Sequence, residues 1–96
     1  MTDVLPESQV FDADTFISIF QPGDSDHGWP NELQYLWTAD QARTLALLDE
    51  VVSAGEITKP VSVGPDKRVW DGHHRVAIAL ALRLPLPVEF VKKFVK

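Results

Sequence analysis

The stretch Trp70-Asp71-Gly72-His73-His74-Arg75-Val76-Ala77 decides the fold of this chain. It joins a short run with apolar residues, 68–70, to a nearly uninterrupted apolar run over residues 76–84. An Asp-Gly step between two such runs predicts a strand that turns sharply into a helix. The first turn of a helix presents backbone N–H groups that lack partners inside the helix, at the positive end of its dipole. Because a phosphate fits such a helix start, the stretch predicts an anion site.

The candidate phosphate ligands at this junction are Gly72, His73, His74 and Arg75. Gly72 allows either a close approach of the backbone to a phosphate or a tight turn with positive φ. The Arg75 guanidinium suits a fork-like contact with phosphate oxygens, or else a salt bridge with an acidic side chain of the N-terminal half. His73 and His74 can donate to an anion, or act as acid and base near neutral pH. As neighbours on a helix they should point in different directions.

Asp71 has two interpretations at the helix start. As the N-cap residue, its carboxylate would bond the same N–H groups that an anion requires. It would also repel a phosphate unless Mg²⁺ lay between the two. The cap is the favoured interpretation, because aspartate is common at caps. Metal binding by the histidines is disfavoured, since no recognised ligand spacing is present and His27 lies in a separate loop.

Length and composition describe an ordinary small domain. The chain has 96 residues, 45% of them hydrophobic, so we expect one domain with one core over residues 1–96. Trp29, Trp37 and Trp70 are expected to help fill that core. The absence of cysteine excludes disulfides, thiolate chemistry and cysteine-based zinc sites. Neither a signal-peptide pattern nor an apolar run of membrane-spanning length is apparent, so we expect a cytoplasmic protein.

The charges are divided unevenly along the chain. Residues 1–57 hold 11 acidic residues and one basic residue, Arg43, whereas residues 58–96 hold 3 acidic and 8 basic residues. The half with the predicted anion site is therefore basic within a chain of net charge −5. The division indicates either attraction between the halves or a functional polarity. The acidic total, without an apparent basic reader helix, argues against direct DNA binding by this chain alone.

The N-terminal part predicts an arm, a strand, a loop and the start of helical structure. Residues 1–9 are polar and predict a loose arm. Residues 16–20 are rich in β-formers and predict a short strand, although Asp12 could instead cap a short helical turn. A surface loop is predicted over residues 21–31, and the apolar spacing of residues 32–37 is compatible with a helix.

A longer helix is predicted over residues 39–53. Thr38 is the expected N-cap, Gln41 completes a capping-box pattern, and Gly55 is the expected terminator. Helical spacing predicts an apolar face directed at the core, formed by Leu45, Leu48 and Val52 with support from Ala42, Leu47 and Val51.

The C-terminal part predicts a hairpin, a helix and a closing strand. The expected elements are a strand over 59–63, a turn at 64–67, a strand over 68–70, a helix over 73–84 that Pro85 and Pro87 end, a strand over 88–91 and a basic tail over 92–96. The helix is apolar on almost every side, so it should be packed on more than one face. Together the elements predict an α+β fold, with helices packed on a small mixed β-sheet.

The residues around the junction resemble the ParB/sulfiredoxin-like superfamily. The similarity covers residues 55–91 and is carried by Pro60-Val61-Ser62-Val63, Arg68-Val69-Trp70-Asp71-Gly72-His73-His74-Arg75-Val76-Ala77, Leu84, Pro87-Val88 and Glu89-Phe90-Val91. Residues 1–54 would then be a divergent N-terminal part with an acidic loop. The resemblance implies a minimal, stand-alone version of the ParB N-terminal domain, a type that is frequent in phage genomes.

The resemblance also implies a nucleotide site. In the superfamily, residues at the positions of Gly72, His74 and Arg75 face nucleotide phosphates, for CTP binding in partition proteins, ATP use in sulfiredoxin and phosphoryl transfer in free-serine kinases. Sulfiredoxin activity is excluded here, because His73 occupies the position of its catalytic cysteine.

Three functions follow in order of preference. The first is binding of a nucleotide, CTP or ATP with Mg²⁺, or of another phosphate-bearing ligand at residues 71–75, with Asp71 as the candidate Mg²⁺ ligand. The second is a non-catalytic interaction or regulatory protein, such as a phage protein that acts on a host partner. Its acidic N-terminal half and the loop with Trp29 would make the contact. The third is a small nucleotidase or kinase with His73 or His74 as acid and base.

Overall fold

The computed structural model of the chain describes residues 8–23 and 28–91. Its elements are β1 (Ser8–Phe11), α1 (Ala13–Ile19), β2 (Gln21–Pro22), α2 (Trp29–Trp37), α3 (Gln41–Ala54), β3 (Val61–Val63), β4 (Arg68–Asp71), α4 (His73–Leu82) and β5 (Leu86–Phe90). Most of the predicted arm, His27 in its loop and the basic tail lie outside the described residues. Ser8 and Gln9, which the sequence assigned to the arm, belong to β1.

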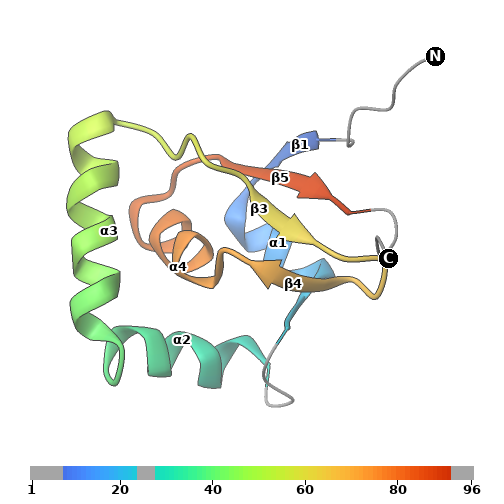
Figure 1. Cartoon of the computed structure of the whole chain (residues 1–96), viewed down its shortest axis with the longest axis horizontal. Coiled ribbons are helices and arrows are strands. Elements are labelled where there is room, and N and C mark those ends of the chain that lie inside the picture. Colours follow the sequence, from blue (N-terminus) through green and yellow to red (C-terminus); the bar gives the residue numbers. More distant parts are fainter. Residues whose placement is uncertain (1–7, 24–27, 92–96) are drawn as a thin grey trace.

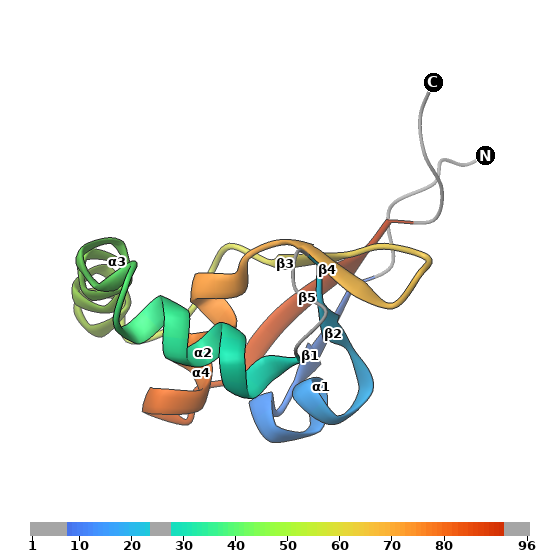
Figure 2. The ribbon, with the colours of Figure 1, turned by 90° about the horizontal axis from the view of Figure 1, so that it is seen from below.

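The strands form one mixed sheet in the order β1-β5-β3-β4-β2. The β1–β5 and β3–β4 pairs are antiparallel, and the β3–β5 and β2–β4 pairs are parallel. Figure 1 shows this sheet and the position of α4 beside it. Seen along the sheet in Figure 2, α1, α2 and α4 lie on one of its sides and α3 stands at one end. The predicted α+β architecture, a small mixed sheet with packed helices, is confirmed.

The core lies between the sheet and α4. Val76, Ala77, Ile78 and Ala79 of this helix have no exposed surface, and the helix contacts α1, α2, α3, β3 and β5. The prediction that α4 is packed on more than one face is therefore confirmed. Burial of a side chain such as Ile78 contributes roughly 1.5–3 kcal/mol, so this helix is the main apolar support of the fold.

The hairpin before α4 is also confirmed, with adjusted ends. β3 begins after Pro60, so this proline precedes the strand. α4 ends at Leu82, because Arg83 takes a left-handed conformation with φ 58°. β5 begins at Leu86 and contains Pro87, which the sequence had placed before the strand. The prolines therefore follow the end of α4, and the closing strand begins between them.

The strand predicted over residues 16–20 is wrong, and the alternative of a helical turn after Asp12 is correct. Asp12 occupies the N-cap position of α1, and its carbonyl accepts a hydrogen bond from the Phe16 N–H at 2.9 Å. Phe16 and Phe20 are spaced four residues apart and both are buried, with ring centroids 4.8 Å from each other. This i,i+4 packing outweighs the β-propensity of the individual residues.

The start of α3 differs from the capping-box prediction. α3 begins at Gln41 with Asp40 in the N-cap position. Thr38 instead follows α2, and its hydroxyl donates to the Gln34 carbonyl at 2.6 Å. In the short connection between α2 and α3, this threonine is thus the C-cap residue of α2. The predicted end of α3 is confirmed, since Gly55 adopts φ 81° at the C-cap.

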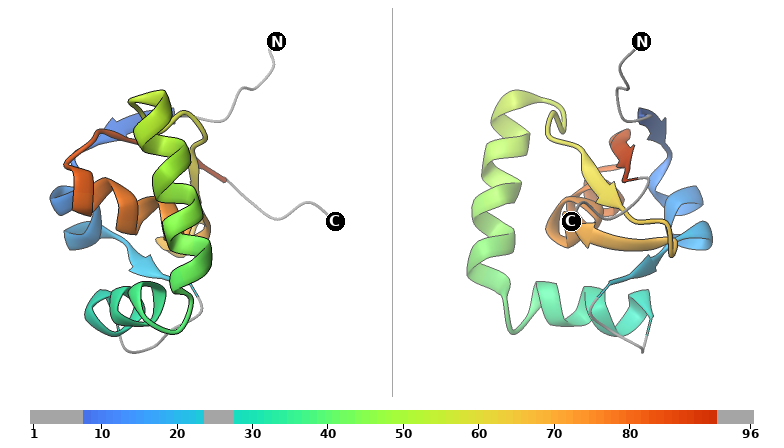
Figure 3. Two further views of the ribbon diagram at one scale, coloured as in Figure 1. Left: turned by 90° about the vertical axis from the view of Figure 1, so that its left-hand side faces the viewer. Right: turned by 45° about the vertical axis from the view of Figure 1, so that its right-hand side comes forward.

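The buried face of α3 agrees only in part with the predicted one, since Leu47, Leu48 and Val51 do pack in or against the core. Thr44 and Val51 are buried, whereas Leu45 and Val52 are 42% and 61% exposed. The Thr44 hydroxyl donates to the Leu36 carbonyl of α2 at 2.6 Å and also lies 3.1 Å from the Asp40 carbonyl. This hydrogen bond satisfies the buried hydroxyl on the side of α3 that faces α2 and the core. The views in Figure 3 show α3 along one side of the molecule, beyond α4.

The three tryptophans have different environments. Trp29 is 4% exposed, and its Nε1–H donates to the Phe20 carbonyl at 2.7 Å. Trp37 packs partly buried against the core. Trp70, predicted to be in the core, is 37% exposed and covers Gly64, where a Cβ would lie 2.0 Å from the indole ring. Trp29 is the first residue of α2 and belongs to the core, so the predicted loop over residues 21–31 ends before it.

Candidate functional site

The site forms where β4 meets α4. β4 ends at Asp71, α4 begins at His73, and Gly72 between them has φ 111°. A Cβ on residue 72 would lie 2.7 Å from Nη1 of Arg75 and 3.0 Å from Cγ2 of Val61. Glycine is therefore required here for its positive φ and for the close approach of the Arg75 side chain. The turn interpretation of Gly72 is confirmed.

Arg75 is held under this turn by backbone and by Asp71. Its Nη1 donates to the Pro60 carbonyl at 3.0 Å, and its Nη2 lies 4.0 Å from Oδ2 of Asp71. The side chain is only 13% exposed. The predicted salt bridge with the N-terminal half is wrong, since the neighbouring carboxylate belongs to β4. These contacts preorganise the guanidinium and leave part of its donor set for other groups.

Asp71 does not cap α4. It is the last residue of β4, and Gly72 takes the N-cap position in its place. The Asp71 carboxylate is 69% exposed and lies nearest to Arg75. The favoured cap interpretation is therefore wrong, and the amides of the first helical turn are not covered by this side chain. The N–H groups of Arg75 and Val76 bond the Gly72 carbonyl at 2.9 and 3.1 Å.

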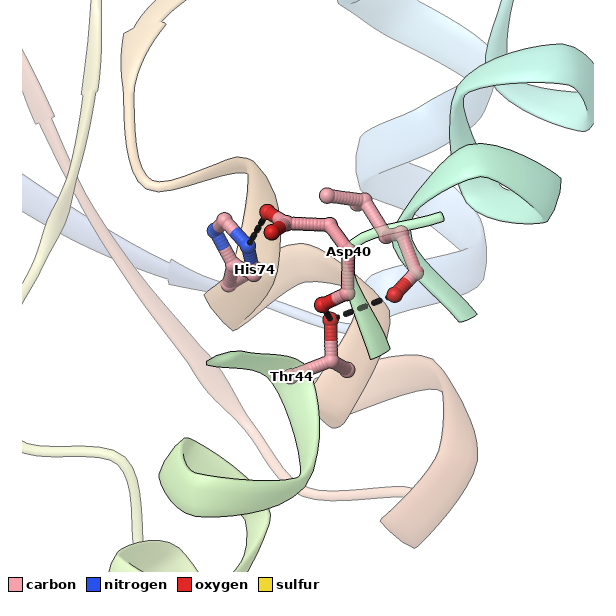
Figure 4. Close-up of polar contacts among 4 residues, drawn as sticks. Asp40, Thr44 and His74 are labelled. Carbon is pink, nitrogen blue, oxygen red and sulfur yellow. Dashed lines mark hydrogen bonds and ion pairs between the residues drawn. The ribbon is translucent and has the colours of Figure 1, made fainter. Parts of the chain in front are cut away.

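His74 pairs with a carboxylate from the N-terminal half. Its Nε2 lies 2.7 Å from Oδ2 of Asp40, and the two side chains are 25% and 20% exposed. Figure 4 shows Asp40 reaching from the start of α3 to His74 at the start of α4, beside Thr44. The sequence predicted neither this partner nor the approach of the two helices. Asp40 has a residue type common at helix starts, but that signal says nothing about His74.

His73 points to a different region, as expected for adjacent histidines on a helix. Its Nε2 accepts the backbone N–H of Gly23 at 3.1 Å. Its ring centroid lies 6.0 Å from that of Trp29. A separate cavity is lined by Gly23, Val69, Trp70 and His73. The structure therefore separates His73 from the other three predicted phosphate ligands.

A cavity of about 230 Å³ opens beside the start of α4. We call it the anion cavity, and its lining residues are Arg43, Leu47, Asp71, Gly72, His74 and Arg75. Three of the four predicted phosphate ligands line it together. Arg43 was not predicted as a site residue. The signal that could have identified it is its position as the single basic residue among residues 1–57.

A second cavity of about 270 Å³ shares Leu47 and Arg75 with the anion cavity. Its lining is completed by Glu50, Val51, Ala54, Glu56, Ile57, Thr58 and Lys59. It is therefore apolar at the base, with carboxylates at its rim, because Val51 and Ile57 are buried and the two glutamates are exposed. We call it the side cavity. Two adjoining cavities of different polarity can accept a ligand with a charged and an uncharged part.

The described residues contain no group of three or more histidine, cysteine or acidic side chains placed to hold a metal ion. Asp71 is thus a single carboxylate at the anion cavity. Among the helices of residues 8–23 and 28–91, none is long and apolar enough to cross a membrane. Comparison of the chain with protein-family models, with curated proteins and with solved structures finds no match.

Proposed function

We propose that the protein binds a nucleotide or another phosphate-bearing ligand in the anion cavity. The observation that carries this proposal is the convergence of Arg43, His74 and Arg75 on one cavity at the start of a helix. Two guanidinium groups supply fixed positive charge and fork-like donors for phosphate oxygens. The helix start adds the positive end of the α4 dipole. Asp71 opposes one of these charges and would be the Mg²⁺ ligand if the metal accompanies the phosphate.

The side cavity favours a phosphate ester over free phosphate. Arg75 lies in both cavities, so a ligand with its phosphate at Arg75 can extend its organic part toward Val51 and Ile57. Glu50 and Glu56 at that end would accept hydrogen bonds from amino or hydroxyl groups. A nucleotide has this combination of an anionic end and a flat body with hydrogen-bond donors.

The ParB/sulfiredoxin-like assignment is part of this proposal. Its support is the order of a strand, a turn, a second strand ending in Asp-Gly, an apolar helix and a closing strand in the described chain. The mixed sheet and the position of Gly72 and Arg75 at the start of α4 are compatible with what the resemblance implies.

Isothermal titration tests the proposal with CTP, ATP and ADP, each with and without Mg²⁺. Arg43→Ala is the sharpest variant, because Arg43 is exposed and its loss should not disturb the core. Arg75→Ala also removes the hydrogen bond to Pro60, so the stability of this variant must be measured together with its loss of binding. Arg83→Ala is the matched control, since this arginine is 83% exposed at the other end of α4.

We expect Arg43→Ala to weaken binding about tenfold or more, the loss of a charge-assisted contact worth about 1.5–3 kcal/mol. Arg83→Ala should bind as the wild type does. A wild-type protein that binds none of the three nucleotides at millimolar concentration, with or without Mg²⁺, would refute the proposal for nucleotides. Titration with inorganic phosphate then decides whether the cavity takes any phosphate.

A second candidate function, contact with another protein, is favoured by the exposed side of α3. Leu45 and Val52 are both exposed, and Asp49 lies between them in the sequence. An apolar partner segment with basic flanks would match this side. Such a partner should be lost from the double variant Leu45→Asp and Val52→Asp but kept by Arg43→Ala. The reverse pattern would assign the contact to the anion cavity.

A further inference from the structure

We infer that the Asp40–His74 pair makes the anion cavity a hydrolytic site for phosphate monoesters, an inference that rests on the proposed function. The notable feature is His74, which lines a basic cavity and has its Nε2 held by the carboxylate of Asp40. Nε2 of His74 lies 2.7 Å from Oδ2 of Asp40, the length of a charge-assisted hydrogen bond. Neither side chain is more than 25% exposed, so the contact is shielded from solvent on most sides.

His74 connects the anion cavity to a carboxylate that lies outside it. His74 lines the anion cavity, whereas Asp40 is not among the residues that line it. His74 therefore contacts both the cavity and the Asp40 carboxylate. In the neutral ring that donates its Nε2–H to Asp40, the lone pair is on Nδ1. Within the described part of the chain, the His74 side chain bonds Asp40 through Nε2, and its Nδ1 is left for a water or a ligand.

A general base positioned by a carboxylate is a recurring device for the activation of a hydroxyl or a water. The carboxylate keeps the ring in one tautomer and stabilises the imidazolium that forms after proton transfer. Asp40 is therefore a positioning residue and His74 the catalytic residue of this inference. Arg43 and Arg75 would neutralise the phosphate oxygens, which otherwise repel an incoming nucleophile, and would stabilise charge in the transition state.

The reaction balances without a further reactant. Nδ1 of His74 removes a proton from a water, whose oxygen forms a bond to phosphorus. The bond between phosphorus and the ester oxygen breaks on the opposite side of phosphorus, in line with the attack. The leaving oxygen takes a proton from solvent, to which the imidazolium of His74 gives up its own. The products are inorganic phosphate and an alcohol, and the ring returns to its neutral form. The organic part of the ester would occupy the side cavity beyond Arg75.

The Asp40–His74 pair could also serve only to join α3 to α4. The following experiment distinguishes this structural role from the catalytic one. The full chain is incubated with p-nitrophenyl phosphate and, separately, with a nucleoside monophosphate, and the released inorganic phosphate is measured. The variants are His74→Gln, Asp40→Asn and Arg43→Ala, with Arg83→Ala as the control at the other end of α4. Binding of inorganic phosphate and thermal unfolding are recorded for each.

We expect wild type to release phosphate and His74→Gln to lose about 10²-fold or more in kcat, the usual contribution of a general base. Asp40→Asn keeps the shape of the side chain, and should lower kcat by about tenfold or more with KM nearly unchanged, as for an interaction used only in the transition state. Arg43→Ala should raise KM, because it removes a ligand contact from an exposed position. Arg83→Ala should retain the wild-type rate.

Failure of the hydrolytic role can be distinguished from failure of the proposed phosphate binding. Phosphate or nucleotide binding by wild type without any phosphate release overturns this inference and leaves the proposed function intact. Release that persists at the wild-type rate in a folded His74→Gln overturns it as well. If His74→Gln fails to fold, Asp40→Asn and Arg43→Ala still decide, because an unchanged kcat in the first and an unchanged KM in the second contradict the assigned roles. An absence of any phosphate binding refutes the proposed function itself.

Discussion

At the residue scale, the junction depends on a glycine with positive φ and with close neighbours that a side chain would displace. Gly72 combines φ 111° with an Arg75 guanidinium and a Val61 methyl close to where a Cβ would be. The packing of Arg75 under the turn and its hydrogen bond to Pro60 therefore require this residue. Gly55 also has positive φ, but a Cβ there would meet no atom within 4 Å. A comparison of substitutions at the two glycines therefore distinguishes the cost of backbone strain, present at both, from the cost of steric contacts, present only at Gly72.

We predict that Gly72→Ala lowers the free energy of unfolding by about 2 kcal/mol or more, since the left-handed penalty of about 1–2 kcal/mol is joined by contacts that must shift. Gly55→Ala should cost only the backbone penalty of roughly 1 kcal/mol. Urea unfolding of the two variants measures the difference. Equal losses would show that the Arg75 side chain moves away from residue 72 at little cost.

At the element scale, α3 is the helix whose buried face the sequence predicts only in part. Leu48 and Val51 of the predicted face pack in or against the core, as expected. Leu45 and Val52 are exposed instead, and Thr44 is buried. Thr44 donates a hydrogen bond to the end of α2, a contact that apolar periodicity does not report. Rotation of α3 that moved the Thr44 hydroxyl away from the Leu36 carbonyl would leave a buried polar group unsatisfied, at a cost of about 1–3 kcal/mol.

Two adjacent valines test this orientation of α3. Val51 is 5% exposed and Val52 is 61% exposed. We predict that Val51→Ala costs about 1.5–2.5 kcal/mol, from the loss of two buried methyl groups. Val52→Ala should change stability by no more than about 0.5 kcal/mol, as exposed sites usually do. Thermal or urea unfolding of the pair gives the answer, and a larger loss for Val52→Ala would support the face predicted from spacing.

At the scale of the whole molecule, local patterns predict the hairpin, α4 and β5, and with them most of the sheet. An Asp-Gly step, a Gly-Pro turn and a continuous apolar helix are signals within a few residues of each other. The site is only partly predictable, because it needs α3 beside α4. Gly72, His74 and Arg75 follow from the motif, whereas Arg43 and Asp40 reach the site from a helix start more than 25 positions earlier. No local pattern encodes that approach.

The central claim is that Arg43, Gly72, His74 and Arg75 form one phosphate-binding cavity. Its most direct test is a ¹H–¹⁵N NMR titration of the full chain with ADP and, separately, with inorganic phosphate. We predict saturable shifts of the amides of Arg43 and of residues 72–75, with little change in β1 and α1. In Arg43→Ala, the shifts of residues 72–75 should reach half-saturation at a ligand concentration about tenfold higher or more. Spectra without saturable shifts, or shifts centred on Trp70 and Gly23 around the separate cavity, would contradict the claim.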